Sequence, residues 1–468
     1  MSIFRPTRRD FLKAGLLGGG GVCALGALNP FARVAMAEEM AAPGESHEYL
    51  TDRYYIFCYF GGGWDILLSL DPRDPVAFNA ETMATTRIQP GYTLLDDVPE
   101  APVIQTAGGL LGFCLGDLAT QHQDKISIVR GINMETLSHA AGKMRFLTGK
   151  EASGVQARGS SVSTWLTSFL GEQETIPHLA VNLATYNKDR PNFASGIKVS
   201  TVSDLLEAIR ADRPFSEQLI DQQIEALLHQ DAQCTRALIS RFSNKAESAR
   251  QKSLEMVSSG LDNTFDFLAN NDEMAAVRTH YGFAKNTNGL STPGARAALA
   301  AKAITSGVSR VVSVTLNGGF DTHGLNWRDD QPERQQAGFN AIARLIEDLS
   351  ATEYKDTGTT WMDHTNIIAF SEFSRTSMLN QNSGRDHWLN NACLVAGADI
   401  KGGQFIGASS DNGMQPQGVN LETGLVDNLG GVTLNPEHVL QTFLHAIGYR
   451  NDPADLRVDP IKALMKNS

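Results

Sequence analysis

The distribution of apolar residues predicts buried strands that alternate with amphipathic helices. Short apolar runs rich in β-forming residues predict strands, and longer stretches with helical spacing predict helices. The predicted strands are 54–60, 126–129, 178–182, 310–316, 365–370 and 391–396, and the predicted helices are 295–306, 333–352 and 436–447. This alternation is typical of a mostly parallel central sheet with helices on both faces. We therefore predict an α/β fold.

Residues 203–275 depart from this alternation. They are polar, rich in Gln, Glu, Arg and Leu, and their apolar positions follow a helical period. We predict a helical insertion here, within one α/β domain that spans residues 51–450 and is followed by a C-terminal tail at 451–468. The insertion fits a lid, a dimer surface or a simple cover for the sheet.

The first residues have the pattern of an export signal. The pair Arg8-Arg9 precedes an apolar, Gly-rich run at 14–28, and residues 35–37 offer a small-x-small cleavage site. The apolar run is too short for a membrane-spanning helix, which needs about 20 residues. We predict a twin-arginine signal peptide at 1–37, a flexible leader at 38–50, and no membrane span after cleavage. The expected partner is the twin-arginine export machinery, and the destination is the bacterial periplasm or cell surface.

The charge balance narrows the range of partners. The sequence holds 40 Lys and Arg against 52 Asp and Glu, and removal of residues 1–37 leaves 35 basic and 51 acidic residues. Because phosphate neutralisation requires clustered Lys and Arg, an acidic chain without a basic block predicts no nucleic-acid partner. No dinucleotide fingerprint, haem motif or iron–sulfur cysteine spacing supports an oxidoreductase.

Carboxylates and imidazoles gather at the predicted strand ends. The residues that share this placement are Asp65, Asp321, His323, Glu372, Asp386 and His387. Ligands bind at the carboxyl edge of open α/β sheets, and this concentration of acidic and imidazole groups is most simply neutralised by one or two divalent metal ions. Mixed Asp, Glu and His ligation suits zinc, manganese or iron better than calcium alone. We predict these six residues as metal ligands, with the alternative that Asp386 only orients His387.

A further polar segment follows the strand predicted at 126–129. Ser138 and His139 stand at the start of a predicted helix, where free backbone N–H groups favour anions. Lys143 and Arg145 add cationic donors for an oxyanion. An ordinary amphipathic helix with a polar cap is the alternative interpretation.

Together these segments resemble a bacterial exported family numbered 1501 among the domains of unknown function. The resemblance covers nearly the whole mature chain. The stretches that carry it are Arg8-Arg9, Gly-Gly-Trp-Asp65, Ser138-His139, Gly-Gly-Phe-Asp321-Thr-His323, Ser-Glu372-Phe-Ser-Arg-Thr376 and Gly-Arg-Asp386-His387-Trp388. That family is grouped with the alkaline phosphatase and sulfatase superfamily. The resemblance implies a large α/β sandwich with a metal site at the strand ends.

The superfamily pattern implies roles for individual positions. Asp65 matches the metal-binding Asp that ends the first strand, and Asp321 with His323 approximates an Asp–His ligand pair at shorter spacing. The nucleophile of sulfatases precedes a Thr-Gly-Arg by nine residues. Here the position nine residues before Thr148 is His139, with Ser138 one residue away. This departure leaves Ser138 as a candidate nucleophile and permits His139 to be a metal ligand instead.

These features predict metal-assisted hydrolysis of a phosphate or sulfate ester. In this hypothesis Ser138 or a metal-activated water attacks the ester, and Arg375, Lys143 or Arg385 holds the non-reacting oxygens. The alternative is a non-catalytic periplasmic or cell-surface protein that uses the same scaffold to bind a ligand or partner. The imperfect nucleophile position favours that alternative.

Overall fold

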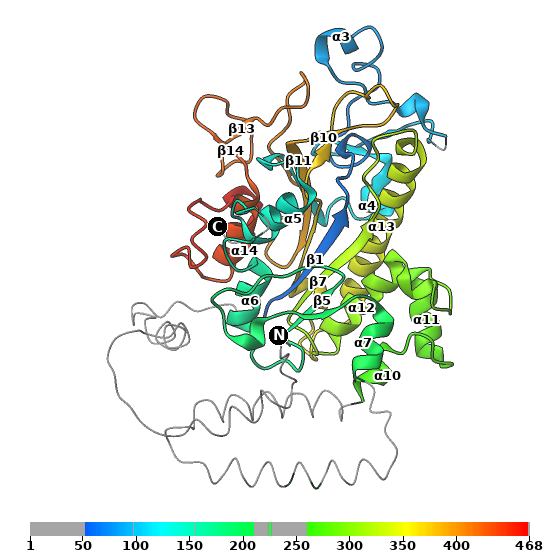
Figure 1. Cartoon of the computed structure of the whole chain (residues 1–468), viewed down its shortest axis with the longest axis vertical. Helices are drawn as coiled ribbons and strands as arrows, with labels where there is room; N and C mark the ends of the chain where they lie inside the picture. Colours follow the sequence, from blue (N-terminus) through cyan, green and yellow to red (C-terminus); the bar gives the residue numbers. More distant parts are fainter. Residues whose placement is uncertain are drawn as a thin grey trace, which may run out of the picture. The chain divides into compact units, whose positions relative to one another are not determined.

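An eight-stranded sheet forms the centre of the fold, in the order β12-β4-β11-β8-β1-β7-β5-β6 (Figure 1). The strands are β1 (Tyr54–Gly61), β4 (Ile126–Asn133), β5 (His178–Val181), β6 (Ile197–Val199), β7 (Val311–Gly318), β8 (Thr365–Phe370), β11 (Asn390–Gly397) and β12 (Phe405–Ile406). Only β11 is antiparallel to its neighbours in this sheet, β8 and β4. The computed structural model describes residues 52–96, 98–154, 156–209, 223, 226 and 260–466.

Helices cover both faces of the sheet (Figure 1). The helices of the described residues are α3 (Met83–Thr86), α4 (Asp117–Gln121), α5 (His139–Thr148), α6 (Val162–Leu170), α7 (Val202–Ile209), α10 (Leu261–Phe265), α11 (Asp272–Tyr281), α12 (Pro293–Thr305), α13 (Trp327–Ala351) and α14 (Pro436–Ala446), of which α3 lies away from the sheet. Side chains of β1 alternate between two hydrophobic cores. Phe60 packs with residues of α12 and α13, whereas Tyr59 packs with residues of α5, α6 and α14. The predicted α/β class, with a mostly parallel sheet covered on both faces, is confirmed.

Within the described residues, three small two-stranded ribbons lie outside the main sheet. They are β2 (Val103–Gln105) with β3 (Leu110–Gly112), β9 (Ser374–Arg375) with β10 (His387–Trp388), and β13 (Gly418–Val419) with β14 (Val432–Thr433). The β9–β10 ribbon matters for function because it places Arg375 directly opposite His387.

All six predicted strands and all three predicted helices are present, with shifted boundaries except at β8. The largest shift is in α13, which begins at Trp327 and passes through Pro332. Its first turns contain few apolar residues, so hydrophobic spacing does not reveal them. They are held instead by buried amides: Gln331 donates to the Phe320 carbonyl at 2.9 Å and accepts the Asp65 backbone N–H at 2.9 Å.

Several predicted segments lie partly or wholly outside the described residues. The predicted signal at 1–37 and leader at 38–50 are outside them, as is most of the helical insertion at 203–275. The described parts of that insertion include α10 and most of α7, and both are helical. The segment predicted as a tail contributes Leu456, Ile461 and Leu464 to the core beside α14. Within the described part of the chain, no helix combines the length and apolar character needed to cross a bilayer.

Candidate metal centre

The loop after β7 carries two residues of the candidate centre at the carboxyl edge of the sheet. Burial alternates along this loop: Phe320 and Thr322 are fully buried, whereas Asp321 and His323 reach solvent. This alternation anchors the loop and points two polar side chains outward. Gly62 at the end of β1 allows the close approach, because a Cβ there would lie 2.6 Å from the Phe320 nitrogen and its φ is +119°.

Helix α5 brings a third residue from another part of the chain. His139 is the first residue of this helix, after Ser138 at the N-cap position. Gly142, one turn later, permits the helix to rest on the end of β8, since a Cβ at this position would lie 2.4 Å from the Glu372 carbonyl oxygen. The contact places the His139 ring beside the Glu372 carboxylate, with Nδ1 2.7 Å from Oε1.

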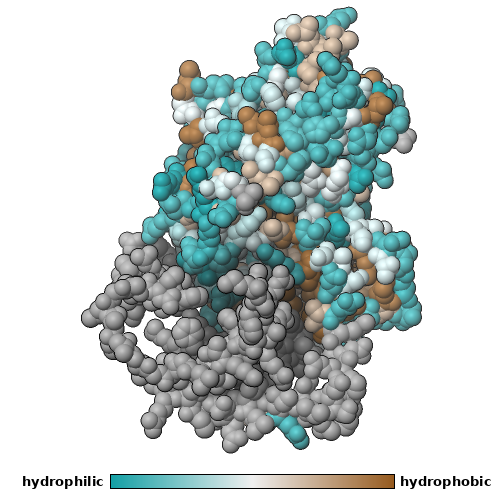
Figure 2. Space-filling view, in the orientation of Figure 1, coloured by the Kyte–Doolittle hydropathy of each residue, from teal (hydrophilic) through white to brown (hydrophobic). Residues whose placement is uncertain are grey.

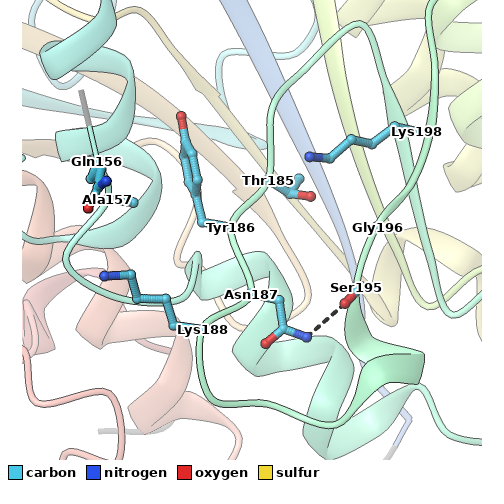
Figure 3. Close-up of a pocket in the computed structure, with 9 residues that line it drawn as sticks. All are labelled: Gln156, Ala157, Thr185, Tyr186, Asn187, Lys188, Ser195, Gly196 and Lys198. Atoms are coloured by element: carbon cyan, nitrogen blue, oxygen red, sulfur yellow. Dashed lines mark hydrogen bonds between the residues drawn. The ribbon is translucent and has the colours of Figure 1, made fainter. Parts of the chain in front are cut away.

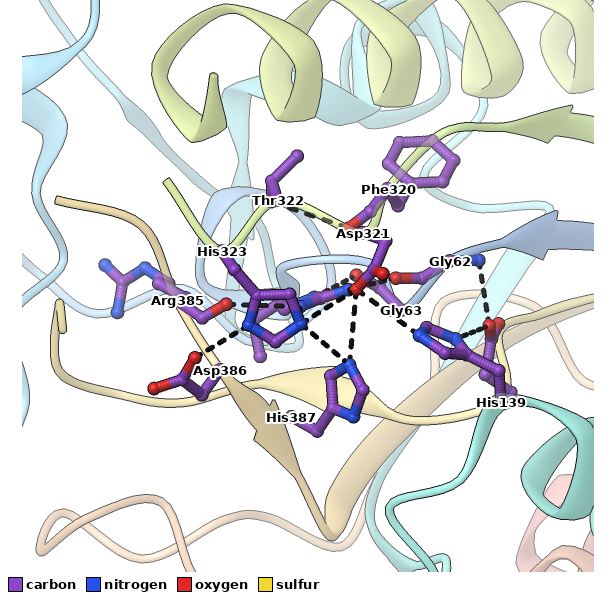
Figure 4. Close-up of polar contacts among 12 residues, drawn as sticks. Gly62, Gly63, His139, Phe320, Asp321, Thr322, His323, Arg385, Asp386 and His387 are labelled. Atoms are coloured by element: carbon purple, nitrogen blue, oxygen red, sulfur yellow. Dashed lines mark hydrogen bonds and ion pairs between the residues drawn. The ribbon is translucent and has the colours of Figure 1, made fainter. Parts of the chain in front are cut away.

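The β9–β10 ribbon supplies the fourth residue. After β8 the chain forms β9, makes a loop, and returns through β10 so that His387 pairs with Arg375. The His387 ring then faces the loop after β7, with its Nε2 3.2 Å from Asp321 Oδ1. The sheet edge, a helix start and a ribbon thus converge on one point (Figure 4).

Asp321 Oδ1 is the centre of this convergence. The Nε2 atoms of His139, His323 and His387 lie 3.3, 3.0 and 3.2 Å from it. The His323 and His387 Nε2 atoms are 3.1 Å apart. One ligand atom each from His139, Asp321 and His387 can be chosen so that all lie within 4.8 Å of one another. We call these four residues, His139, Asp321, His323 and His387, the His/Asp cluster.

The opposite nitrogen of each imidazole is fixed by an acceptor. Nδ1 of His139 lies 2.7 Å from Glu372, Nδ1 of His323 lies 2.7 Å from Asp386 Oδ1, and Nδ1 of His387 lies 2.8 Å from the Leu137 carbonyl oxygen. Because carbonyl and carboxylate oxygens accept, each Nδ1 carries the proton. In the neutral ring the Nε2 lone pair then faces the centre of the cluster. This outward anchoring of imidazoles is typical of metal-binding histidines.

The donor set fits a divalent metal ion. The Nε2 atom of His139 is buried and makes no hydrogen bond, so its lone pair is left without a partner inside the protein. Bond lengths of about 2.0–2.1 Å in a tetrahedral site place neighbouring ligand atoms about 3.3 Å apart. The distances from Asp321 Oδ1 to the Nε2 atoms of His139 and His387 are close to this value, and these three residues are the ones whose ligand atoms all lie within 4.8 Å of one another. Imidazole nitrogens with a carboxylate oxygen suit zinc and related transition metals better than calcium.

The electrostatics of the cluster follow from its buried partners. The hydrogen bond to Glu372 raises the pKa of His139, against the opposing effect of burial. Burial lowers the pKa of His387. Burial acts to raise the pKa of Asp321, but the hydrogen bond from the Arg375 guanidinium and the contact with the His387 ring outweigh it and hold this pKa well below its usual range. Asp321 is therefore a carboxylate at neutral pH.

Two residues that the sequence predicts as ligands, Glu372 and Asp386, lie outside the His/Asp cluster and contact only the outer nitrogens of its imidazoles. Glu372 is 1% exposed and contacts the cluster only through the outer nitrogen of His139, while it also accepts the Gly62 N–H at 2.9 Å. Asp386 likewise contacts the outer nitrogen of His323. In this arrangement both residues orient imidazoles. For Asp386 this is the alternative role considered from the sequence, although the ring that it holds is His323 and not His387.

Asp65 is not brought to the cluster. Its carboxylate is completely buried, and Oδ2 accepts from Trp327 Nε1 at 2.7 Å and pairs with Arg385 Nε at 2.8 Å. Oδ1 caps the 3-10 helix that follows β1 by accepting the Leu67 N–H at 3.1 Å. The side chain thus supports the loop from beneath and is fully occupied there.

The two arginines proposed as oxyanion clamps are also occupied. Arg375 donates to the Gly62 and Gly63 carbonyl oxygens, to the Arg385 carbonyl at 3.1 Å and to Asp321 at 2.8 Å. Arg385 pairs with Asp65 and donates to the Thr376, Gln89 and Pro90 carbonyls. Neither guanidinium is exposed, so both act as braces in this structure. Ser138, in contrast, is exposed and makes no capping hydrogen bond.

Sequence reasoning missed the backbone part of the site. The Leu137 carbonyl fixes the tautomer of His387, and the Gly62 and Gly63 carbonyls hold Arg375. Backbone acceptors leave no residue-type signal. The buried amides Gln331 and Gln335 were also missed, because Gln331 precedes the helix predicted at 333–352 and its pairing with Gln335 depends on the earlier observed start of α13.

The fold and the cluster define an α/β protein with a candidate His/Asp metal centre at the carboxyl edge of a mostly parallel sheet. The chain belongs to the family described as "Protein of unknown function (DUF1501)", whose model matches residues 55–445. The family resemblance noted from the sequence is therefore confirmed.

Comparison with curated proteins finds no match. Among solved structures, Ps i-CgsB in complex with k-i-k-neocarrahexaose is 8% identical, with a TM-score of 0.36 over 88% of this chain and 75% of that chain. A Bacteroides thetaiotaomicron structure from work on the metabolism of multiple glycosaminoglycans is 11% identical, with a TM-score of 0.31 over 85% and 73%. Alkaline phosphatase from the Antarctic bacterium TAB5 is 10% identical, with a TM-score of 0.25 over 75% and 92%.

Proposed function

We propose that this chain is an exported, metal-dependent hydrolase of phosphate or sulfate esters. The observation that carries the proposal is the convergence of three imidazole nitrogens on Asp321 Oδ1, within 3.0–3.3 Å, with every outer nitrogen held by an acceptor. His139, Asp321 and His387 would hold a single divalent ion, of the zinc or manganese type, with His323 beside them. Such an ion polarises an ester oxygen and lowers the pKa of an attacking hydroxyl or water.

The residues around the cluster would prepare the ester for attack. The first-turn N–H groups of α5, a ten-residue helix that begins at His139, favour an anion beside the cluster. Lys143, one turn further on, adds a positive charge and lies with Nζ 5.7 Å from the ring centre of Tyr59. These groups take the oxyanion-binding role that the occupied Arg375 and Arg385 leave open.

Two nucleophiles fit this arrangement. The exposed Ser138 hydroxyl at the N-cap of α5 stands next to His139 in the chain. Alternatively, a water adds its oxygen to phosphorus or sulfur, the ester P–O or S–O bond breaks, and the alcohol leaves with one proton of that water. Ser138→Ala abolishes turnover in the first case and leaves most of it in the second.

The test is metal analysis of the purified protein together with hydrolysis of p-nitrophenyl phosphate and p-nitrophenyl sulfate. We expect about one metal ion per chain, turnover of at least one ester, and loss of both in His387→Ala and Asp321→Ala. A protein that binds no zinc or manganese, with turnover and stability unchanged in both variants, contradicts the proposal.

One observation favours a second candidate function. Arg375 and Arg385, the two arginines predicted to hold the non-reacting oxygens, are both buried and hydrogen-bonded within the protein. A protein that binds a metal or metal–ligand complex without hydrolysing it needs no free guanidinium. Metal bound at the cluster without turnover of either ester, or of a broader panel of esters, would support this binding function.

We also propose export by the twin-arginine route, on the strength of Arg8-Arg9, the apolar run and the cleavage site. Replacement of both arginines by lysine should hold the full-length chain in the cytoplasm. Wild-type protein should be recovered from the periplasm or cell surface without residues 1–37. Equal export of both forms contradicts this proposal.

A further inference from the structure

A cavity lined by two lysines lies outside the His/Asp cluster, against the edge of the sheet that ends in β6 (Figure 3). It has a volume of about 490 Å³. Three segments form it: residues 156–157 after α5, residues 185–188 after β5, and residues 195–198 at the start of β6. Nothing in the proposed hydrolytic chemistry uses these residues.

The charge of the cavity is entirely positive. Its lining includes Lys188 and Lys198 and no acidic residue. In Figure 3, Lys198 extends its ammonium toward Thr185 and Tyr186, and Lys188 extends toward Gln156. Both lysines are exposed, and among the described residues neither ammonium group has an ion-pair or hydrogen-bond partner; the Lys188 backbone N–H donates to the Ser160 hydroxyl at 2.9 Å.

The nearest acidic side chain in the same loop does not neutralise these lysines. Asp189 accepts the Ser160 hydroxyl at 2.6 Å and lies 3.6 Å from Arg190 Nε. Arg190 in turn stacks over Trp165 at 3.8 Å from the ring centre. The two ammonium groups therefore give the cavity an uncompensated positive field, which an anionic ligand would satisfy.

The uncharged polar side chains that line the cavity can both donate and accept hydrogen bonds. Gln156, Thr185 and Ser195 each present donor and acceptor capacity, which matches hydroxyl groups that also donate and accept. Asn187 donates to Ser195 at 2.8 Å, so the two sides of the loop are joined across the cavity. Tyr186 adds a half-buried aromatic ring.

Tyr186 places one wall of the cavity against the hydrophobic core that also contains Tyr59. A ligand seated in the cavity lies on the face of the sheet that carries α5.

We propose that this cavity binds a hydroxyl-rich anionic ligand, namely a sugar that bears a phosphate, sulfate or carboxylate group, with Lys188 and Lys198 attracting its charge. The binding stands apart from the proposed hydrolysis and does not require it. The hydroxyl groups of the ligand meet Gln156, Thr185 and Ser195.

The test is calorimetric titration of the full chain with glucose 6-phosphate, glucose 6-sulfate and glucuronate, and with glucose and inorganic phosphate for comparison. The protein is treated with a chelator first, so that the His/Asp cluster holds no metal. We expect the charged sugars to bind more tightly than glucose and than free phosphate, with affinity that falls as salt rises. Lys188→Gln and Lys198→Gln should each weaken binding by about threefold to tenfold.

The matched control is Lys285→Gln, which makes the same charge change at an exposed lysine that does not line the cavity and is distant from it in sequence. It should leave the affinity unchanged, and thermal unfolding should show that all three variants are folded. Equal binding of glucose and glucose 6-phosphate overturns the proposal, as does unchanged affinity in both cavity variants. Binding that disappears with chelation assigns the ligand to the metal centre and also overturns it.

Discussion

Glu372 Oε1 lies 2.7 Å from His139 Nδ1, although the glutamate is only 1% exposed. Burial acts to raise the pKa of Glu372, but the hydrogen bonds from His139, Tyr59 and Ser371 outweigh it and hold the pKa below its ordinary value. The buried carboxylate is therefore charged at neutral pH. It fixes the His139 ring so that Nε2 faces Asp321 at 3.3 Å.

The first prediction concerns this positioning role. Glu372→Gln keeps the size of the side chain but removes its charge and introduces an N–H group that can face His139. We expect zinc affinity to fall about tenfold to a hundredfold, as is usual when the partner of a metal-binding histidine is lost. The measurement is competition with a chromophoric chelator. Glu353→Gln, an exposed glutamate that accepts the Gly358 N–H, is the control and should not change affinity.

The second prediction concerns metal removal. A ligand that binds only the folded state stabilises it by about 2.7 kcal/mol when its concentration is a hundred times the Kd. Chelation should therefore lower the Tm of the wild-type protein, and His387→Ala should remove this response. His445→Ala, on α14 outside the cluster, should respond as the wild type does. An identical Tm with and without chelator in wild-type protein would argue against a resident metal.

The fold was largely predictable from sequence because its strands are apolar along their whole length. Strand β8, buried at every position from Thr365 to Phe370, was predicted with the observed boundaries. Strands buried on both faces are typical of mostly parallel sheets, and they leave continuous apolar runs. The start of α13 was missed because buried glutamines and not apolar residues hold it in place.

The site was predictable only as a set of candidates. The sequence prediction grouped Asp321, His323 and His387 with Asp65, because it placed all four at or shortly after the ends of predicted strands. Their different roles depend on the path of the loops. The return of the chain through β10 sets His387 opposite Arg375, and the Asp65 side chain turns beneath the loop toward Arg385. Neither turn is encoded in residue spacing.

The third prediction concerns the Asp65–Arg385 pair, in which neither side chain is exposed and the closest contact is 2.8 Å. Asp65→Asn leaves the buried Arg385 charge without its partner, and removal of one member of a buried pair costs about 3–5 kcal/mol. We expect the free energy of unfolding to fall by about this amount in urea titrations. The double variant Asp65→Leu with Arg385→Met should recover part of the loss, because no buried charge remains.

The Asp65→Asn variant also distinguishes two roles for Asp65, a brace for the loop and a metal ligand. If the side chain braces the loop, folded Asp65→Asn protein should retain its zinc stoichiometry. Loss of zinc from a variant with native circular dichroism would instead make Asp65 a ligand, as the superfamily pattern implies.

The fourth prediction concerns pH and a histidine remote from the cluster. His178 is completely buried on β5, with Nε2 2.9 Å from the Ser313 hydroxyl, and burial lowers its pKa from 6.5 to about 4. Between these values the unfolded chain binds a proton that the folded chain does not. The contribution of His178 to stability is therefore complete above pH 6.5 and is lost as the pH falls toward 4, by about 3 kcal/mol in all.

His178→Gln should reduce the dependence of unfolding free energy on pH across this window, as measured by urea titration at pH 7.5, 6.0 and 5.0. The wild type and variant should differ most in slope between pH 6.0 and 5.0, and parallel curves would show that His178 titrates normally in the folded protein.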